Sequence, residues 1–287
     1  MALRDLLVYV DQTEAAFARL HLAADLARLH SSQLTALFVR QLTPRQLDDL
    51  SVAELGLASA GAMDGVNRRI EASIDAAADR LRLALEALAT EYGLTAEWRC
   101  VNGLASAVVP QHARYADLCI LGHERAGENT CGEYRFSEQM LFGTGRPLVF
   151  IPEAGSFRTL GRNIVVAWNS SRPAARAVND ALPLIERAER TTVLLVNPAD
   201  CIDRHGARPG EAMLEHLIRH GARADAVQIE NVPAGAIANA LQAKARALGA
   251  DLLVAGAFGH PSLWEKLLGG VTRDLLDHLT LPLMMSH

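Results

Sequence analysis

The feature that most constrains the fold of this chain is an internal duplication. Residues 4–39 read "RDLLVYVDQTEAAFARLHLAADLARLHSSQLTALFV", and residues 162–197 read "RNIVVAWNSSRPAARAVNDALPLIERAERTTVLLVN". Each segment has an apolar run typical of a buried strand, a polar turn, a helical pattern and a second apolar run. Asp11 of the first copy aligns with Asn169 of the second. This repeated order indicates one supersecondary unit that is built twice.

The alignment continues to the end of each copy. It pairs "YADLCILGH" with "GADLLVAGA", and "GRPLVFIP" with "TLPLMMSH". We therefore predict a first domain over residues 1–152 and a second domain over residues 161–287. The first copy is longer by about two dozen residues, which we assign to the Gly/Ala/Ser-rich stretch 41–65. A long helix should follow, because apolar residues recur there at helical spacing: Ile70, Ile74, Ala77, Leu81, Leu85 and Leu88.

Strand and helix patterns alternate along each copy. The strands are short, continuous apolar runs, as expected where helices cover both faces of a sheet. Alternation of this kind implies parallel strands with right-handed crossovers. We therefore predict an α/β fold of two tandem doubly wound parallel sheets, each with five strands.

In doubly wound sheets, ligands bind beyond the carboxyl ends of the strands, where the strand order reverses. The residues that follow or end the first, second and fourth strands should therefore surround one crevice in each copy. These residues are Asn169, Val196 and Gly256 in the second copy, and Asp11, Val39 and Gly122 in the first.

The second copy carries a glycine-rich segment after its fourth strand, "GAFGHPSLWEKLLGGVTRDLL". Gly256, Gly259, Gly269 and Gly270 would expose backbone N–H groups, and the helix that follows would add the positive end of its dipole. Thr272 adds a hydroxyl group in the first turn. The arrangement is compatible with an anion site, although such glycines also serve tight turns and close packing. It is neither a Walker A loop, since no GK[ST] occurs, nor a GxGxxG dinucleotide fingerprint.

The segment resembles the G-x2-G-x9-G-(S/T) signature of the universal stress protein family, and the tandem arrangement resembles its two-domain members. The resemblance implies an adenine nucleotide alpha hydrolase-like fold and an adenine nucleotide ligand, ATP or AMP, with or without Mg²⁺. In ATP-binding members an Asp ends the first strand, the second strand contacts adenine, and the glycine motif holds ribose and phosphates. Carried over, these roles imply a nucleotide site at Ala167, Asn169, Val196, Gly256, Gly259, Gly269, Gly270, Val271 and Thr272.

The chain departs from the family pattern in both copies. Asn169 replaces the Asp and removes a negative charge that could hold a metal with the phosphates, and Gly270 replaces the Ser/Thr hydroxyl. We therefore expect nucleotide binding rather than hydrolysis. In the first copy Arg125, Arg135 and Phe136 stand where the second has glycines. We expect these side chains to fill that cradle and leave a degenerate site that binds no nucleotide.

The resemblance also places the final strands, "PLVFIP" and "PLMMS", at sheet edges, where exposed strands invite pairing. We expect the two copies to pack as a pseudo-dimer and whole chains to form homodimers. The net charge of −5 argues against a nucleic-acid partner. No apolar run approaches about 18 residues, so no membrane association is expected. Four cysteines without CxxC spacing and an N-terminus without a signal-peptide pattern indicate the cytoplasm.

Other polar residues have simpler interpretations. His216 and His220 share a helix face but lack an evident third metal ligand, so we expect solvated side chains and no metal site. His260 could reach a phosphate, but a loop histidine that faces water is the simpler interpretation. Asp117 and Asp251 begin matching strands and are interpreted as turn residues rather than catalytic acids.

Three functions remain open at this point. The first is a nucleotide-binding protein that acts in the stress response by conformational signalling. The second is a dimeric scaffold that binds no nucleotide. The third is a weak ATPase, which would lack an evident general base and have only Lys266 and Arg273 as a cationic clamp. No GxSxG elbow is present, which excludes a serine hydrolase, and no catalytic residue is assigned.

Overall fold

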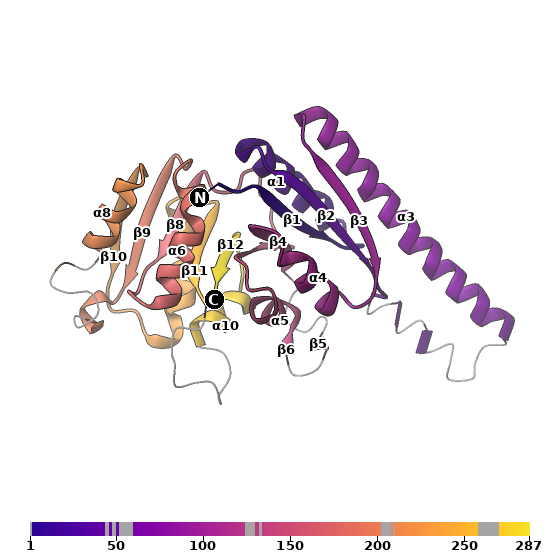
Figure 1. The fold of residues 1–287 in the computed structure, drawn as a ribbon. Helices are drawn as coiled ribbons and strands as arrows, with labels where there is room; N and C mark the ends of the chain where they lie inside the picture. The colour runs from indigo at the N-terminus through magenta and orange to yellow at the C-terminus, as the bar shows by residue number, and fades with distance from the viewer. Residues whose placement is uncertain are drawn as a thin grey trace.

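The computed structural model describes most of the chain. The described residues are 2–43, 46–47, 50–51, 60–123, 130–131, 134–201, 208, 210–257 and 270–287. Two halves of similar architecture follow each other along the sequence (Figure 1). The last strand of the first half ends at Pro152, and the first strand of the second half begins at Asn163.

The two halves repeat one order of strands and helices. The first half contains β1 (Asp5–Val10), α1 (Ala15–His30), β2 (Gln33–Arg40), α3 (Ala60–Tyr92), β3 (Ala96–Asn102), α4 (Ala105–Ala113), β4 (Leu118–His123), β5 (Thr130–Cys131), β6 (Tyr134–Arg135), α5 (Phe136–Gly143) and β7 (Leu148–Pro152). The second half contains β8 (Asn163–Ala167), α6 (Arg172–Ile185), β9 (Arg190–Val196), η2 (Pro198–Cys201), α8 (Glu211–Arg219), β10 (Ala224–Ile229), η3 (Ala234–Ala236), α9 (Ile237–Ala247), β11 (Leu252–Gly256), α10 (Gly270–Asp277) and β12 (Leu283–Ser286).

The main strands form one ten-stranded sheet in the order β10-β9-β8-β11-β12-β7-β4-β1-β2-β3, and β5 and β6 form a separate ribbon. Within each half, every neighbouring pair of strands in the large sheet is parallel. In both halves the first strand is central, the second and third lie on one side, and the fourth and fifth lie on the other. The predicted α/β fold with five parallel strands per copy is confirmed. The sheets differ from the expectation in being continuous with each other.

The continuity comes from the last strand of each half. β12 pairs with β7 in antiparallel orientation, with Met284 opposite Val149 at the centre of the register. We call this junction the seam. These are the two strands that were predicted to lie at sheet edges, and at the seam each provides the hydrogen-bonding edge that the other needs. The expected pairing of the two copies within one chain is confirmed, while dimerisation of whole chains stays a prediction.

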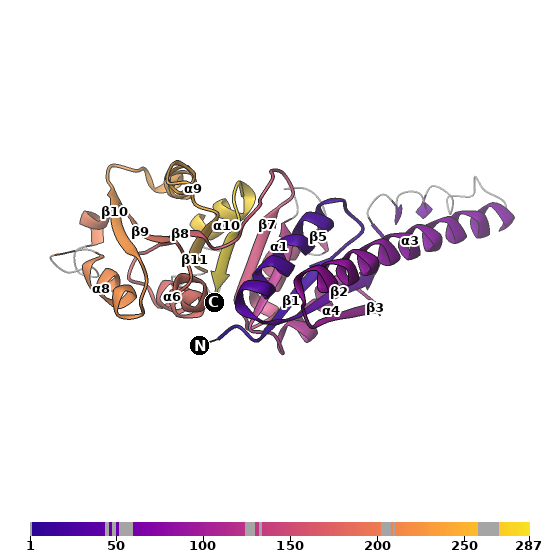
Figure 2. The same cartoon turned by 90° about the horizontal axis from the view of Figure 1, so that it is seen from above.

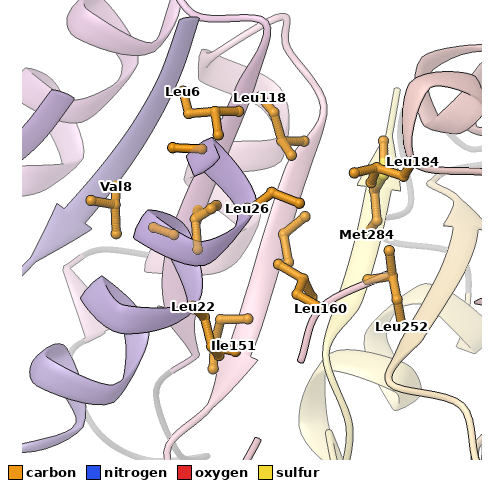
Figure 3. Close-up of a cluster of buried hydrophobic side chains, with 14 of the residues drawn as sticks. Leu6, Val8, Leu22, Leu26, Leu118, Ile151, Leu160, Leu184, Leu252 and Met284 are labelled. Atoms are coloured by element: carbon orange, nitrogen blue, oxygen red, sulfur yellow. The ribbon is translucent and has the colours of Figure 1, made fainter. Parts of the chain in front are cut away.

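Helices cover both faces of the sheet (Figure 2). Buried residues of α1, α3, α6 and α8 belong to one apolar core, and buried residues of α4, α5, α9 and α10 belong to another. Each core contains residues from both halves. Figure 3 shows the junction in the first core, where Leu160 lies between Leu26 and Ile151 of the first half and Leu184 and Met284 of the second. The halves therefore share a core on each face of the sheet.

The long helix that the sequence predicts is α3. All six of its predicted inward-facing residues are buried: Ile70, Ile74, Ala77, Leu81, Leu85 and Leu88. Figure 1 shows α3 beside the outer strand β3 and continuing past the sheet. Part of the predicted insertion, residues 41–65, lies outside the described residues.

The shared core predicts that a truncation at the seam destabilises the whole chain. Met284 is fully buried beside Leu160 and Leu184 (Figure 3). We expect Met284→Ala to lower the free energy of unfolding in urea by about 3 kcal/mol, because it leaves a cavity in a close-packed core. Leu83, 56% exposed on α3, provides the matched control, and Leu83→Ala should change the free energy by less than about 0.5 kcal/mol. Equal effects of the two truncations would contradict a shared core.

Candidate functional site

The strand order of the sheet reverses at β8 in the second half, and the place where a crevice is expected, beyond the strand ends, is here called the crevice. β8 lies between β9 and β11, and the chain leaves β8 toward one side and returns to β11 on the other. Doubly wound sheets bind ligands at such a reversal, beyond the carboxyl ends of the strands. Ala167 ends β8, Val196 ends β9 and Gly256 ends β11. Three of the predicted site residues therefore lie along one edge of the sheet.

Asn169 lies in the turn that leads from β8 into α6. It is exposed, and its side-chain Oδ1 accepts a hydrogen bond from the backbone N–H of Ser171 at 3.2 Å. Ser171 is the N-cap of α6, since its Oγ accepts from the N–H of Ala174 at 3.3 Å. Asn169 thus shapes the turn that opens α6. A carboxylate at this position could accept the same bond from Ser171.

The chain after Val196 is fixed by a residue that the sequence analysis did not single out. Asn197 has a positive φ of 47°, which Asn tolerates better than most residues. Its side chain donates to the carbonyl of Val232 at 2.7 Å and accepts from the N–H of the same residue at 3.0 Å. The ends of β9 and β10 are thereby tied together. The backbone of Val196, proposed to meet a ligand, is held at a defined position.

Gly256 has a local packing reason to be glycine. A Cβ atom at this position would lie 2.8 Å from the carbonyl oxygen of Pro173 and would also collide with the backbone of Ala174. Both residues belong to the first turn of α6. The element that approaches Gly256 most closely is therefore the helix backbone of its own domain. A glycine in this pattern is consequently no evidence of a ligand by itself.

The remaining predicted residues come from the segment between β11 and β12. Gly259 and Gly269 lie outside the described residues. Gly270, Val271 and Thr272 form the first turn of α10, whose N-terminus lies toward the carboxyl ends of the second half's strands because α10 leads back to the start of β12. Gly270 is exposed, with open space where a Cβ would stand, and Thr272 is only 6% exposed. The structure thus brings this turn to the same edge of the sheet as Ala167, Val196 and Gly256.

The crevice of the first half is occupied by a side chain of its own domain. Arg19 of α1 is 2% exposed. Its Nε donates to the carbonyl of Tyr9 at 2.8 Å, and its Nη2 donates to Oδ2 of Asp11 at 2.7 Å. Asp11 also accepts from the backbone N–H of Thr13 at 2.9 Å. The carboxylate that the family pattern assigns to ligand binding is therefore engaged within the protein.

Burial raises the pKa of Asp11, but the positive charge of Arg19 and the hydrogen bonds from Thr13 outweigh it, so the pKa lies below its ordinary value. The carboxyl group is consequently ionised at neutral pH and forms a largely buried ion pair with Arg19.

Gly122 and Gly256 align in the two copies but accommodate different neighbours. A Cβ at Gly122 would lie 2.9 Å from Cζ of Arg19, so glycine leaves room for the guanidinium group. In the duplication, Arg19 aligns with Ala177, which is buried in α6. A small residue at that position lets the backbone of α6 approach β11. The same glycine thus serves a buried arginine in one half and close helix packing in the other.

The residues expected to fill the cradle of the first copy have the following surroundings. Arg125 lies outside the described residues, and Arg135 directs its guanidinium to Asp277 of the other half. Phe136 packs against Tyr9 with ring centroids 5.6 Å apart. Arg19 fills the space beside Gly122, which the sequence analysis did not predict, and the filling of the first-half cradle by Arg125, Arg135 and Phe136 stays a prediction. The sequence does contain a sign of this difference, because the first copy has Arg19 where the aligned helix of the second copy has Ala177.

The two aligned aspartates act as turn residues, as expected. Asp117 accepts hydrogen bonds from the backbone N–H groups of Arg4 and Asp5 at 2.7 and 3.1 Å. Asp251 accepts from three successive N–H groups, those of Gly161, Arg162 and Asn163, at 3.1, 3.0 and 2.9 Å. Each carboxylate therefore anchors the start of its half's first strand.

Among the described residues, no helix is long and apolar enough to cross a lipid bilayer.

Comparison with known proteins identifies the class of this fold. Residues 161–287 match the model of the universal stress protein family. The second half of the chain is therefore a domain of that family, and the first half repeats its strand order. None of the curated proteins compared with the chain matches it.

Solved structures with the same fold span almost the whole chain. A universal stress protein from Archaeoglobus fulgidus DSM 4304 is 17% identical, with a TM-score of 0.66 over 98% of this chain and 96% of its own. A protein from Pseudomonas aeruginosa UCBPP-PA14, provisionally called a universal stress protein, is 16% identical, with a TM-score of 0.59 over 99% and 93% of the two chains. At these identities the likeness establishes the fold alone.

The buried ion pair of the first half yields a stability prediction. We expect Arg19→Ala to lower the free energy of unfolding by about 3 kcal/mol, because it leaves the Asp11 carboxylate without its cation. Arg82→Ala, which removes an exposed pair with Glu86, is the matched control and should cost less than about 0.5 kcal/mol. The double variant Asp11→Asn/Arg19→Ala should lose less than the sum of its two single variants, since the pair acts as a unit. Additive losses in urea unfolding would show that the pair is not coupled.

The pH dependence of this pair follows from the lowered pKa of Asp11. A carboxyl group with a pKa lower in the folded than in the unfolded state stabilises the fold above its unfolded pKa, near 4, and loses that contribution in acid. The stability gap between wild type and Arg19→Ala should therefore narrow as the pH falls below about 4. A gap that widened in acid would contradict the assignment.

Proposed function

We propose that the second domain binds an adenine nucleotide, ATP or AMP, beyond the carboxyl ends of β8, β9 and β11. The observation that carries this proposal is the family match over residues 161–287, the half of the chain that retains the glycine pattern. The geometry supports it, because the open first turn of α10 lies at the same edge of the sheet as the ends of those strands. In this proposal Ala167 and Val196 lie beside the nucleoside, and the Gly270–Thr272 turn lies beside the phosphates.

The proposed role is signalling in a stress response rather than catalysis. Asn169 presents a carboxamide where the first half has the carboxylate of Asp11, so this position offers no negative charge for a Mg²⁺ ion that accompanies ATP. Gly270 offers an N–H group but no hydroxyl. Binding and release of the nucleotide would then change the state of the domain without consuming the ligand. We propose that this takes place in the cytoplasm, the compartment indicated by the cysteine pattern.

A structural role is proposed for the first domain. Its crevice contains the Arg19–Asp11 ion pair, which favours a domain that supports its neighbour over one that binds a second nucleotide. The final strands pair with each other inside the chain, so homodimers would have to use other surfaces than these two strands. The scaffold and weak ATPase alternatives are the outcomes that the following measurements would reveal.

Titration calorimetry with ATP and AMP, each with and without Mg²⁺, tests the proposal directly. We expect one nucleotide per chain. Gly259→Val should abolish binding while the far-ultraviolet circular dichroism stays that of wild type, because the branched side chain obstructs the proposed cradle. Wild-type protein that neither binds these nucleotides nor carries one through purification would favour the scaffold. Steady release of ADP above a protein-free blank would favour the ATPase.

Restoring the two family residues should strengthen binding. The structure accommodates both changes, since an Asp at 169 can accept the bond from Ser171 and the space around Gly270 is open. We expect Asn169→Asp/Gly270→Ser to bind Mg-ATP about tenfold more tightly, equivalent to about 1.4 kcal/mol. Gly65→Ser is the control for the second change, because Gly65 also has open space around it but lies on α3. Unchanged affinity in the double variant would mean that these two positions do not face the phosphates.

A further inference from the structure

Helix α10 connects the crevice edges of the two halves. Because β7 and β12 are antiparallel, the strands of the two halves end at opposite edges of the sheet. α10 begins at the carboxyl edge of the second half and runs back to the start of β12, which lies at the carboxyl edge of the first half. Its eight residues span about 12 Å at 1.5 Å per residue. Figures 1 and 2 show α10 beside the last strands of the two halves.

The first half holds α10 through three polar contacts. The ring of His123, at the end of β4, lies close enough to the backbone carbonyl of Leu276 for that carbonyl to act on its pKa. Arg135 forms an ion pair with the carboxylate of Asp277. Arg273 lies with its Nε 3.7 Å from Oε1 of Glu138. Arg273 and Asp277 are spaced i and i+4, so their side chains share one side of the helix.

Two of the residues that make these contacts, His123 and Glu138, have buried side chains. His123 is 7% exposed, and burial lowers its pKa to about 4, so its ring is neutral at pH 7. The side chain of Glu138 is 4% exposed and also accepts from the backbone N–H of Arg135 at 3.3 Å. His123, Arg135 and Glu138 therefore form one anchored group, here called the clamp.

The clamp matches what the end of α10 needs. The last carbonyl groups of a helix have no partner within the helix, and the negative end of its dipole favours a nearby cation. The ring of His123 lies near one such carbonyl, that of Leu276, and Arg135 supplies a positive charge beside the last residue. An eight-residue helix is marginal by itself. It therefore depends on tertiary contacts, which include the clamp, the neighbouring helix α9 and the burial of Leu275 and Leu276 in the second core.

We propose that the first domain acts as a positioning element for the ligand site of its neighbour, with Arg135 and His123 fixing α10 and thereby the Gly270–Thr272 turn. This inference rests on the proposed nucleotide function of the second domain. It gives a role to the crevice edge of the first half, whose own crevice is filled by Arg19. By thermodynamic linkage, a nucleotide that binds the ordered turn must also strengthen the hold of the clamp on α10.

The test measures the clamp and the site separately. Amide hydrogen exchange is followed in the absence of nucleotide for wild type, Arg135→Gln, Asp277→Asn and the double variant, and affinity for ATP is measured by calorimetry. We expect amides of residues 270–277 to exchange about five- to tenfold faster in each variant, with α6 unchanged. The dissociation constant for ATP should rise about three- to tenfold, and the double variant should lose no more than either single variant.

Three further variants make the result specific. The exchanged pair Arg135→Asp/Asp277→Arg should restore both slow exchange and affinity, because it rebuilds the ion pair with its charges reversed. His123→Phe, which replaces the polar ring beside the Leu276 carbonyl with an apolar one, should act in the same direction as Arg135→Gln. Arg190→Ala breaks an ion pair with Asp225 elsewhere in the second domain and should leave both readouts within about twofold of wild type.

Each outcome decides a separate point. Wild-type exchange rates in Arg135→Gln and His123→Phe would overturn the positioning role. Faster exchange without any change in ATP affinity would overturn the link between α10 and the ligand. A wild-type protein that binds no ATP would overturn the proposed function and the link between α10 and the ligand. Because exchange is measured without nucleotide, the exchange rates would still show whether the first domain holds α10.

Discussion

The antiparallel pairing of β7 with β12 is the interaction on which the rest of this architecture depends. Each half ends in a short apolar strand whose free edge would be exposed in isolation. Pairing the two edges satisfies both and makes one sheet out of two. It also brings Leu160 and Met284 into a core that extends across the junction. The reversal of direction at this pair then places the two crevices at opposite edges, with α10 running between them.

The aligned glycines show how a repeated residue can serve two local purposes. At Gly256 the absent Cβ lets the backbone of α6 approach, whereas at Gly122 it makes room for the side chain of Arg19. Both halves need a residue without a side chain at the end of the fourth strand because the helix after the first strand packs against it there. The difference between them is carried by one position of that helix, Arg19 or Ala177. The packing within each half therefore explains why Gly122 and Gly256 are glycines, without a ligand.

The sequence predicted the elements that depend on local pattern and on the duplication. The five parallel strands of each half, the buried side of α3 and the anchoring roles of Asp117 and Asp251 follow from periodicity and from aligned positions. It did not predict that Arg19 enters the first crevice, because a buried arginine is favoured only by partners that the fold assembles, the Tyr9 carbonyl and Asp11. The partner of Arg135 was missed for the same reason, since Asp277 lies 142 positions further along the chain. The parts of the glycine motif at Gly259 and Gly269 stay predictions.

The contacts on α10 have a consequence for how such a chain can diverge. In a symmetric dimer of single domains, each interface residue must be compatible with a copy of itself across the two-fold axis. Covalent fusion removes that requirement. Arg135 aligns with Gly269 and Asp277 aligns with Gly143, so this ion pair has no mirror-image counterpart. The two halves of one chain can therefore carry different residues at matching positions of their junction, which two identical chains related by a two-fold axis cannot.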